Sequence, residues 1–134
     1  MCLYGNDIDE GTTPFEAALG FVVKLEKESF IGKDALMNQK GEGVKRKRVG
    51  ISMLEPGIPR EHFEVFKDQT KIGSVMSGTF SPLLNRGVAM AYVTSENSSA
   101  GQHVKVKIRG RLVEGEIVKF PFYDSTRYGY GRKT

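Results

Sequence analysis

Polar and acidic residues gather near the N-terminus, where their types and spacing could support binding chemistry. The group comprises Tyr4, Asn6, Asp7, Asp9 and Glu10. Carboxylates beside an amide and a phenol could bind a cation or form hydrogen bonds with an amino-substituted ring. The same acidic run precedes a Thr-Thr-Pro sequence, which is typical of a solvated turn. The residues themselves leave both interpretations open.

Basic residues form a second group with binding potential. Residues 45–48 are Lys-Arg-Lys-Arg, and the C-terminal tail alternates basic residues with tyrosines: Tyr123, Arg127, Tyr128, Tyr130, Arg132 and Lys133. Such patches could bind nucleic acid or an acidic partner, although a solvated entry into a strand also explains the first run. We expect Arg48 to point its guanidinium at a fixed carboxylate, since it adjoins an apolar strand.

Catalytic and metal-binding sets are not found in the sequence. His62 and His103 are the only histidines and Cys2 is the only cysteine. A Cys/His zinc site therefore could not reach four protein ligands without recruiting carboxylates. Cys2 has no nearby base and orienting group, which a nucleophile needs. We predict no catalytic residue and no metal site in this chain.

The length and composition fit one ordinary domain. The chain has 134 residues, 39% hydrophobic and 27% charged, and no apolar run approaches the roughly 18 residues of a membrane span. Neither a basic leader nor an apolar signal core follows Met1, so we expect a cytoplasmic location and no membrane partner. A net charge of +4 allows nucleic acid or anionic small molecules as partners, although an excess of this size is common in proteins that bind neither.

The elements that must position these groups are mostly strands. A short helix is predicted near 32–40, opened by Gly32 with Asp34 in its first turn, and residues 19–24 are predicted to be extended. Alternating or apolar runs at 48–53, 63–66, 71–76 and 87–93 predict strands, the last one covered on both faces. We therefore predict a mainly β fold, an antiparallel barrel or distorted jelly roll, with one short helix in the N-terminal linker.

The hairpin at 104–119 is the best specified local structure. A type II′ turn at Gly110-Arg111 would place Lys107 opposite Glu114 and Lys105 opposite Glu116. The apolar residues at 104, 106, 108, 113 and 117 would then share one face. These basic residues are thus expected to be neutralised within the hairpin.

Several collinear segments of the chain resemble a known family. They include Leu-Tyr-Gly-Asn-Asp at 3–7, Phe-Ile-Gly-Lys at 30–33, Gly-Ile-Pro-Arg at 57–60, Ser-Gly-Thr-Phe-Ser-Pro at 77–82 and Ala-Met-Ala-Tyr-Val at 89–93. Their order and spacing are similar to the C-terminal third of the glycine cleavage T-protein family, the folate-dependent aminomethyltransferases. The resemblance covers essentially the whole chain.

The resemblance implies an activity and its partners. Family members transfer the aminomethyl carbon from the lipoyl arm of H-protein to tetrahydrofolate and release ammonia. The family's catalytic aspartate belongs to the first domain, and no position here corresponds to it. We therefore expect this chain to be inactive alone and to work with the missing N-terminal portion of the enzyme and with lipoylated H-protein.

The resemblance also implies site residues and domain limits. Tyr4, Asn6 and Asp7 would lie nearest the cofactor channel, and Arg48 and Arg60 are candidates for substrate or partner contacts. Residues 1–44 would form a linker from the folate-binding core, and 45–134 the barrel domain. Family members carry an arginine-containing strand just before this point, so we expect the first fourteen or so residues to be poorly anchored here.

Two alternatives remain open from the sequence. One is a barrel related to folate-dependent demethylating oxidases or to folate-binding proteins of tRNA modification. The other is a free-standing basic β-barrel that binds RNA through residues 45–48 and the aromatic tail.

Overall fold

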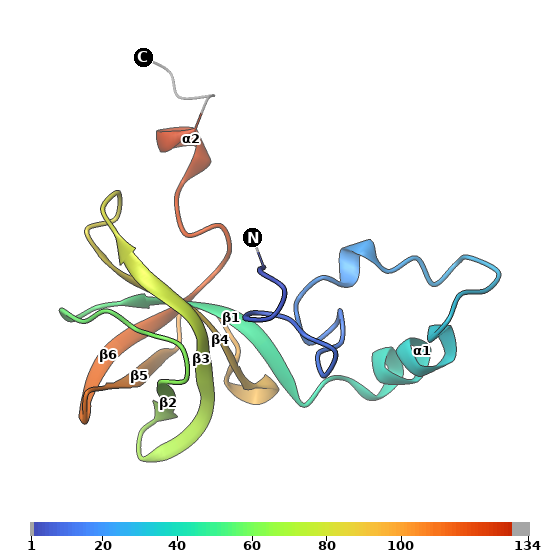
Figure 1. Ribbon diagram of the computed structural model, residues 1–134, viewed down its shortest axis with the longest axis horizontal. Helices are drawn as coiled ribbons and strands as arrows, with labels where there is room; N and C mark the ends of the chain where they lie inside the picture. Colours follow the sequence, from blue (N-terminus) through green and yellow to red (C-terminus); the bar gives the residue numbers. More distant parts are fainter. Residues whose placement is uncertain (1, 130–134) are drawn as a thin grey trace.

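The computed structural model describes residues 2–129 and shows a β-barrel with an arm beside it and a tail after the last strand (Figure 1). The strands are β1 (Arg46–Met53), β2 (Glu64–Lys67), β3 (Thr70–Ser81), β4 (Arg86–Thr94), β5 (His103–Ile108) and β6 (Arg111–Val118). The helices are α1 (Lys33–Glu42), α2 (Ser125–Tyr128) and the 3-10 helices η1 (Gly20–Val22) and η2 (Ser95–Asn97). The predicted mainly β fold is confirmed, and α1 supplies the short helix expected in the N-terminal region.

The sheet closes on itself. Its strand order is β1-β4-β3-β2-β5-β6, and β6 returns to pair with β1. All of these pairs are antiparallel. Closure gives each strand two neighbours, which removes the open edges that an isolated sheet would present.

Aliphatic side chains fill the barrel interior. They come from every strand: Val49, Ile51, Met53, Val65, Ile72, Val75, Ala89, Ala91, Val93, Val104, Val106, Val113 and Ile117. On β4 the opposite face is buried too, since Val88 and Tyr92 are 7% and 4% exposed. The prediction that this strand is covered on both faces is confirmed. Tyr92 is on the outer face of β4 and is covered there by another part of the chain.

Two glycines on β3 allow close approach of neighbouring backbone. A Cβ at Gly73 would lie 1.8 Å from the carbonyl oxygen of Tyr92 on β4. A Cβ at Gly78 would lie 2.4 Å from the carbonyl oxygen of Pro59. Because side chains would prevent these approaches, the glycines let β3 pack against both β4 and the β1–β2 connection.

The β5–β6 hairpin has a different turn from the predicted one. Arg109 and Gly110 form the turn with φ of +49° and +82°, the signs of a type I′ turn, which matches the twist of the strands. Lys105 therefore faces Glu114 and Lys107 faces Leu112, so the predicted register was wrong by two residues. A shift of two keeps each side chain on its predicted face, because the strand period is two.

Lys107 has a different ion pair from the predicted one. Its Nζ lies 3.6 Å from Glu64 Oε2 on the neighbouring strand β2. Of the two lysines on β5, Lys107 is thus paired across β2 and not within its own hairpin.

The prediction that residues 19–24 are extended was wrong. Residues 20–22 form η1, in which Val22 N donates to Leu19 O at 3.0 Å and Val23 N to Gly20 O at 3.1 Å. No barrel strand pairs with this segment within the described residues, so its backbone satisfies its hydrogen bonds locally.

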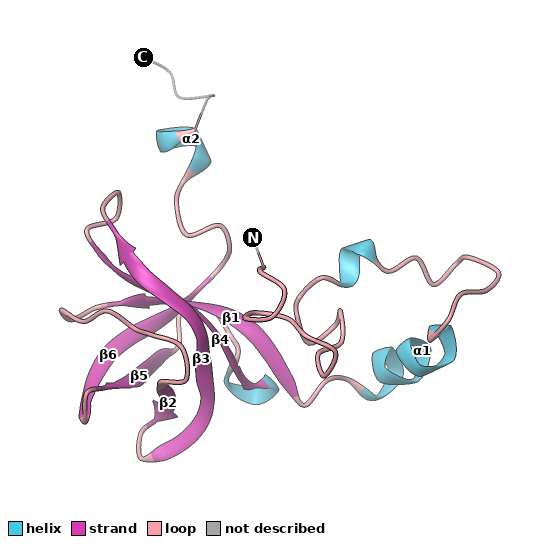
Figure 2. Ribbon diagram, in the orientation of Figure 1, coloured by secondary structure: helices cyan, strands magenta, loops and turns pink. Residues whose placement is uncertain are grey.

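Two parts of the chain precede the barrel, and we name them by their residues. Residues 2–17 are the N-terminal segment, which lies against the barrel, and residues 18–43 are the arm, which extends to one side and returns to β1 (Figures 1 and 2). The arm is mostly loop around α1, and α1 has no buried residue. In the described part of the chain, no helix has the length and apolar character needed to cross a membrane.

Candidate functional site

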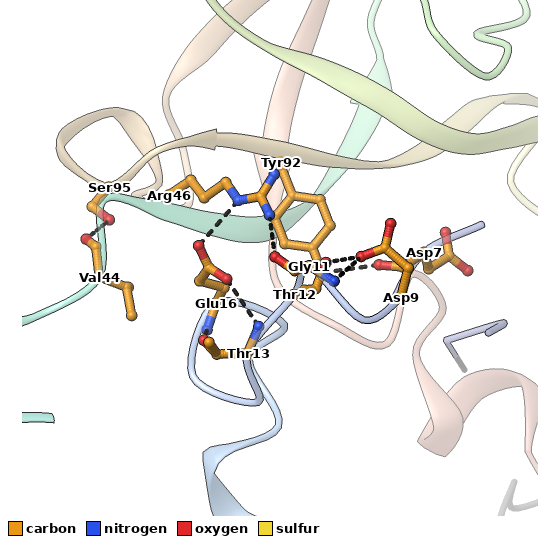
Figure 3. Close-up of polar contacts among 10 residues, drawn as sticks. All are labelled: Asp7, Asp9, Gly11, Thr12, Thr13, Glu16, Val44, Arg46, Tyr92 and Ser95. Atoms are coloured by element: carbon orange, nitrogen blue, oxygen red, sulfur yellow. Dashed lines mark hydrogen bonds and ion pairs between the residues drawn. The ribbon is translucent and has the colours of Figure 1, made fainter. Parts of the chain in front are cut away.

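Asp7 anchors the N-terminal segment to the barrel. It is 1% exposed, and its Oδ1 accepts a hydrogen bond from Ser77 Oγ of β3 at 2.6 Å. Its Oδ2 accepts from Leu3 N at 2.9 Å. The hydroxyl of Tyr92 on β4 donates to the Asp7 carbonyl oxygen at 2.9 Å (Figure 3). The buried carboxylate is therefore satisfied by the protein itself, as a buried charge requires.

Tyr4 and Asn6 belong to the same tight loop as Asp7 but are less buried. The loop is closed by Gly5 N donating to Ile8 O and Asp7 N donating to Leu3 O, both at 2.8 Å. Tyr4 is 66% exposed and Asn6 is half-buried. The loop thus holds Asp7 against the barrel while the Tyr4 ring is open to solvent.

The N-terminal segment makes more contacts than we expected for its first fourteen residues. Besides the Asp7 hydrogen bonds, Arg46 Nη2 donates to Gly11 O at 3.1 Å. The guanidinium of Arg46 also lies 5.0 Å from the centre of the Tyr92 ring. The N-terminal segment is therefore held by residues of β1, β3 and β4.

A capping box organises the end of the N-terminal segment. Thr13 N donates to Glu16 Oε2 at 2.9 Å, and Glu16 N donates to Thr13 Oγ1 at 3.3 Å. Pro14 follows the capping threonine, where its fixed φ suits the first position of a helical turn. The Thr-x-x-Glu spacing is a sequence signal for this structure that our sequence analysis missed.

Glu16 connects this turn to the barrel. Its Oε1 lies 3.1 Å from Arg46 Nε at the start of β1 (Figure 3). Burial alone would raise the pKa of Glu16, but the Thr13 N–H and the Arg46 guanidinium outweigh it and lower the pKa. The carboxylate is thus kept ionised for the ion pair.

Burial raises the pKa of Tyr92, although Arg48 opposes this effect. The phenol therefore stays protonated at neutral pH, which its donated hydrogen bond to Asp7 requires.

Arg48 contacts carbonyl, sulfur and aromatic groups, whereas we had expected a carboxylate. Its Nε donates to Ala17 O at 2.8 Å and its Nη1 lies 3.3 Å from Met90 Sδ. The guanidinium also lies 4.9 Å from the centre of the Phe120 ring. Together with Arg48 N, which donates to Glu16 O at 2.8 Å, these contacts fix the junction between the N-terminal segment and the arm.

Arg60 occupies a separate, exposed position in the connection between β1 and β2. Within residues 2–129, no hydrogen bond or ion pair joins it to Tyr4, Asn6, Asp7 or Arg48. Of the basic and aromatic tail, Tyr130, Arg132 and Lys133 lie outside the described residues. The structure therefore joins Asp7 to the barrel, places Arg48 nearby, and leaves Arg60 as a surface residue.

The arrangement positions the N-terminal segment against the barrel, and the absence of a catalytic residue stays a prediction. Among the residues that the structure describes, no group of three or more His, Cys, Asp or Glu side chains could hold a metal ion. The contacts to the N-terminal segment are made by Ser77, Tyr92 and Arg46, and Glu16 pairs with Arg46. Our sequence analysis named Arg46 only as part of the basic run at 45–48 and did not single out the other three. Tyr4 and Asn6 are the predicted cofactor contacts that are less buried than Asp7, and their role stays a prediction.

A solved structure resembles the whole arrangement. The glycine cleavage system aminomethyltransferase T of Bartonella henselae is 34% identical to this chain and matches it with a TM-score of 0.86. The match covers 92% of this chain and 35% of that one. It therefore extends beyond the barrel into the residues that precede it.

Curated relatives agree with this result. Aminomethyltransferases of Halothermothrix orenii and Bacillus subtilis are 47% and 48% identical over 90% of this chain. The chain spans about a third of their length, 34% in both cases. Residues 46–124 match the glycine cleavage T-protein C-terminal barrel domain. Since this match takes in more than half of the chain, the chain belongs to the family of glycine cleavage T-protein C-terminal barrel domains.

Proposed function

We propose that this chain supplies the C-terminal portion of a tetrahydrofolate-dependent aminomethyltransferase. The observation that carries the proposal is its 47–48% identity to curated aminomethyltransferases over 90% of its own length but only 34% of theirs. The complete activity would transfer the aminomethyl carbon from the lipoyl arm of H-protein to tetrahydrofolate with release of ammonia. The chain would need the N-terminal two thirds of such an enzyme and lipoylated H-protein as partners.

The barrel's part in this function is to hold the loop that carries Tyr4 and Asn6. Tetrahydrofolate would supply the acceptor for the one-carbon unit. Tyr4 fits a contact with the cofactor, because it is 66% exposed, and the half-buried Asn6 adds an amide on the same loop. Asp7 fits that role less well, since both of its carboxylate oxygens already accept hydrogen bonds from Ser77 and Leu3. We assign Asp7 to positioning the loop.

The two arginine candidates would have different roles. The Arg48 guanidinium already contacts Ala17, Met90 and Phe120. Its proposed role is therefore to fix the N-terminal segment and not to contact a partner. Arg60 is exposed and could meet an acidic group of a partner surface. The division into a linker at 1–44 and a barrel domain at 45–134 belongs to the same proposal, and the cytoplasmic location stays a prediction.

Two observations favour this function over RNA binding. Arg46 and Arg48 make contacts with the N-terminal segment, which removes half of the basic run at 45–48 from a possible phosphate surface. The relatives reported above are aminomethyltransferases, which also separates the chain from the related demethylating and tRNA-modifying families.

The test is a chimera in which this chain replaces the matching C-terminal third of the Bacillus subtilis aminomethyltransferase. Glycine cleavage is assayed with lipoylated H-protein and tetrahydrofolate. We expect turnover by the chimera and none by the isolated chain, since we predict no catalytic residue in this chain and the family's catalytic aspartate belongs to the first domain. A folded but inactive chimera, or turnover by the purified isolated chain, would refute the proposal.

A further inference from the structure

Two hydroxyl groups on neighbouring strands hold Asp7 by different atoms. Ser77 Oγ of β3 donates to the Asp7 carboxylate at 2.6 Å, and the Tyr92 hydroxyl of β4 donates to the Asp7 main-chain carbonyl oxygen at 2.9 Å. One hydrogen bond fixes the side chain and the other fixes the backbone. Because each hydrogen bond has a preferred direction, the pair restricts the orientation of Asp7 as well as its position.

A β-bulge in β3 precedes Ser77. Val75 pairs with Ala91 of β4 and Ser77 pairs with Met90, so Met76 is an extra residue in β3. Since the strand period is two, Ser77 would share the inward face of Val75 if β3 were regular. The extra residue turns Ser77 to the opposite face.

Ser77 and Tyr92 therefore share the outer face of the barrel. Ala91 belongs to the core, so its neighbours Met90 and Tyr92 point outward. Ser77 lies opposite Met90 and points to the same side. β-bulges are frequent beside functional sites, where they re-aim a side chain. In this barrel the bulge brings the Ser77 hydroxyl to the Asp7 carboxylate.

The loop that these hydroxyls hold is also bonded within itself. Leu3 O accepts from Asp7 N at 2.8 Å, and Leu3 N donates to the Asp7 carboxylate at 2.9 Å. Gly5 has a φ of +91°, a conformation that favours glycine over residues with a side chain. A loop closed in this way moves as one unit, so fixing Asp7 also fixes the direction of Tyr4 and Asn6.

We propose that Ser77 and Tyr92 are positioning residues for tetrahydrofolate binding, because they orient the loop that presents Tyr4 and Asn6. This inference rests on the proposed function. Asp7 and Tyr92 are 1% and 4% exposed, so water does not compete for the hydrogen bond between them. Without either hydroxyl the loop samples more orientations, and only a fraction of the molecules present the two side chains correctly. The apparent affinity falls by that fraction.

The first experiment measures tetrahydrofolate binding and turnover by the chimera described above. Tyr92→Phe removes one hydroxyl, and the matched control Tyr123→Phe removes the same atom from a tyrosine that is 44% exposed in the tail. Tyr92→Phe should raise both the Kd and the KM for tetrahydrofolate about fivefold, and kcat and the KM for H-protein should change by less than about twofold. The control should leave all four values unchanged. A loss of kcat without a change in Kd would overturn the inference.

Ser77 allows a rescue experiment. Ser77→Ala removes the donor, whereas Ser77→Thr keeps a hydroxyl on the same carbon. The alanine variant should bind tetrahydrofolate about fivefold more weakly, and the threonine variant should bind it within about twofold of the unaltered chimera. Ser99→Ala is the control, because Ser99 is exposed. Equal losses for the alanine and threonine variants would assign the effect to packing at the bulge and would overturn the role of the hydroxyl.

Amide exchange of the 134-residue chain tests the loop without the cofactor. Gly5 N and Asp7 N both donate hydrogen bonds inside the loop. Their exchange should be about fivefold faster in Tyr92→Phe and Ser77→Ala than in the unaltered chain, and unchanged in the two controls. Exchange in β1 and β6 should be the same in all variants, which separates this effect from a general loss of stability. Equal exchange of both amides in every variant would refute the positioning role.

These experiments separate the positioning role from the proposed activity. An active chimera in which Tyr92→Phe and Tyr123→Phe leave the same affinity for tetrahydrofolate would contradict only the positioning role. A folded but inactive chimera whose affinity falls selectively with Tyr92→Phe would contradict only the transfer activity. A folded chimera that binds no tetrahydrofolate would contradict both.

Discussion

The barrel and the arm gain their order in different ways. In the barrel, residues such as Ile51, Val65 and Val106 are completely buried, and hydrogen-bonded strands surround them. In the arm, α1 buries none of its residues, and the backbone hydrogen bonds join residues close in sequence. The same chain therefore contains a unit that is stabilised by its own core and a unit whose apolar side chains still face solvent. The N-terminal segment is intermediate, since a few polar contacts tie it to the barrel.

A charge in the barrel core should produce the largest effect. Val106→Asp places a carboxylate at a position with 0% exposure, which should cost several kcal/mol and unfold most molecules. Ile108→Asp should cost less, because Ile108 is only half-buried at the end of β5. Lys107→Ala, on the exposed face between them, should leave the denaturant midpoint unchanged. Equal losses for the substitutions at 106 and 107 would show that the inward face of β5 is misassigned.

A glycine-to-alanine substitution should destabilise the barrel and stabilise the arm. Gly73→Ala would bring a methyl group to 1.8 Å from the Tyr92 carbonyl oxygen and should cost about 3 kcal/mol, because β3 and β4 must separate. Gly41→Ala in α1 meets no atom within 4 Å and should stabilise the helix by about 0.5 kcal/mol. Urea denaturation checks both values. A neutral Gly73→Ala would mean that the two strands lie farther apart than described.

Removal of the Asp7 carboxylate should release the N-terminal segment and leave the barrel folded. Asp7→Ala leaves the Ser77 hydroxyl and the Leu3 N–H without their acceptor, at a cost of about 1–3 kcal/mol. Amide exchange at residues 3–8 should therefore accelerate about tenfold or more, with little change at β1 or β4. Asp9→Ala is the control, since its hydrogen bonds to Gly11 and Thr12 are exposed and local. If both variants accelerated amide exchange equally, Asp7 would not be the residue that anchors the N-terminal segment.

The smallest expected effect concerns the pH dependence of the Glu16 contact. Because the pKa of Glu16 is lowered from its ordinary value of 4.5, its contribution is present above pH 4.5 and is lost as the pH falls further, through the lower pKa of the folded chain. The contribution should be under about 1 kcal/mol, as for other partly solvated ion pairs. Exchange at residues 13–17 should therefore show a pH-dependent loss of protection below pH 4.5 that Glu16→Gln removes. A profile that is the same in both proteins would assign the dependence to another carboxylate.

Much of the barrel was predictable from local patterns. Alternation in β1 and the apolar run in β4 predicted their positions, and the family resemblance indicated a barrel. The hairpin turn was harder, because Gly110 is compatible with either turn position and only the twist of the paired strands favours a positive φ at Arg109. The extent of β3, which continues to Ser81, depends on pairing with β4 and not on its own alternation.

The candidate site was less predictable, because it depends on contacts between distant residues. Asp7 was chosen for its acidic neighbours and its resemblance to a motif, but its burial depends on Ser77, seventy positions away. Arg48 was expected to find a carboxylate, whereas the pair with Glu16 is made by Arg46, two positions earlier on β1. The Thr13–Glu16 capping box was the one part of this site with a purely local signal.

The position of β1 in the strand order also has a consequence for how the chain folds. β1 lies between β4 and β6, with Ile51 paired to Ala89 on one side and to Ile117 on the other. During synthesis β1 therefore leaves the ribosome well before β4 and β6 have been made. The edge of β1 that pairs with β6 stays unpaired until nearly the whole barrel has been synthesised. Such distant pairing slows folding and leaves an apolar edge available to other chains in the meantime. Release from the ribosome before β6 is complete would leave the buried half of β1 with one edge unpaired and open to association with other chains.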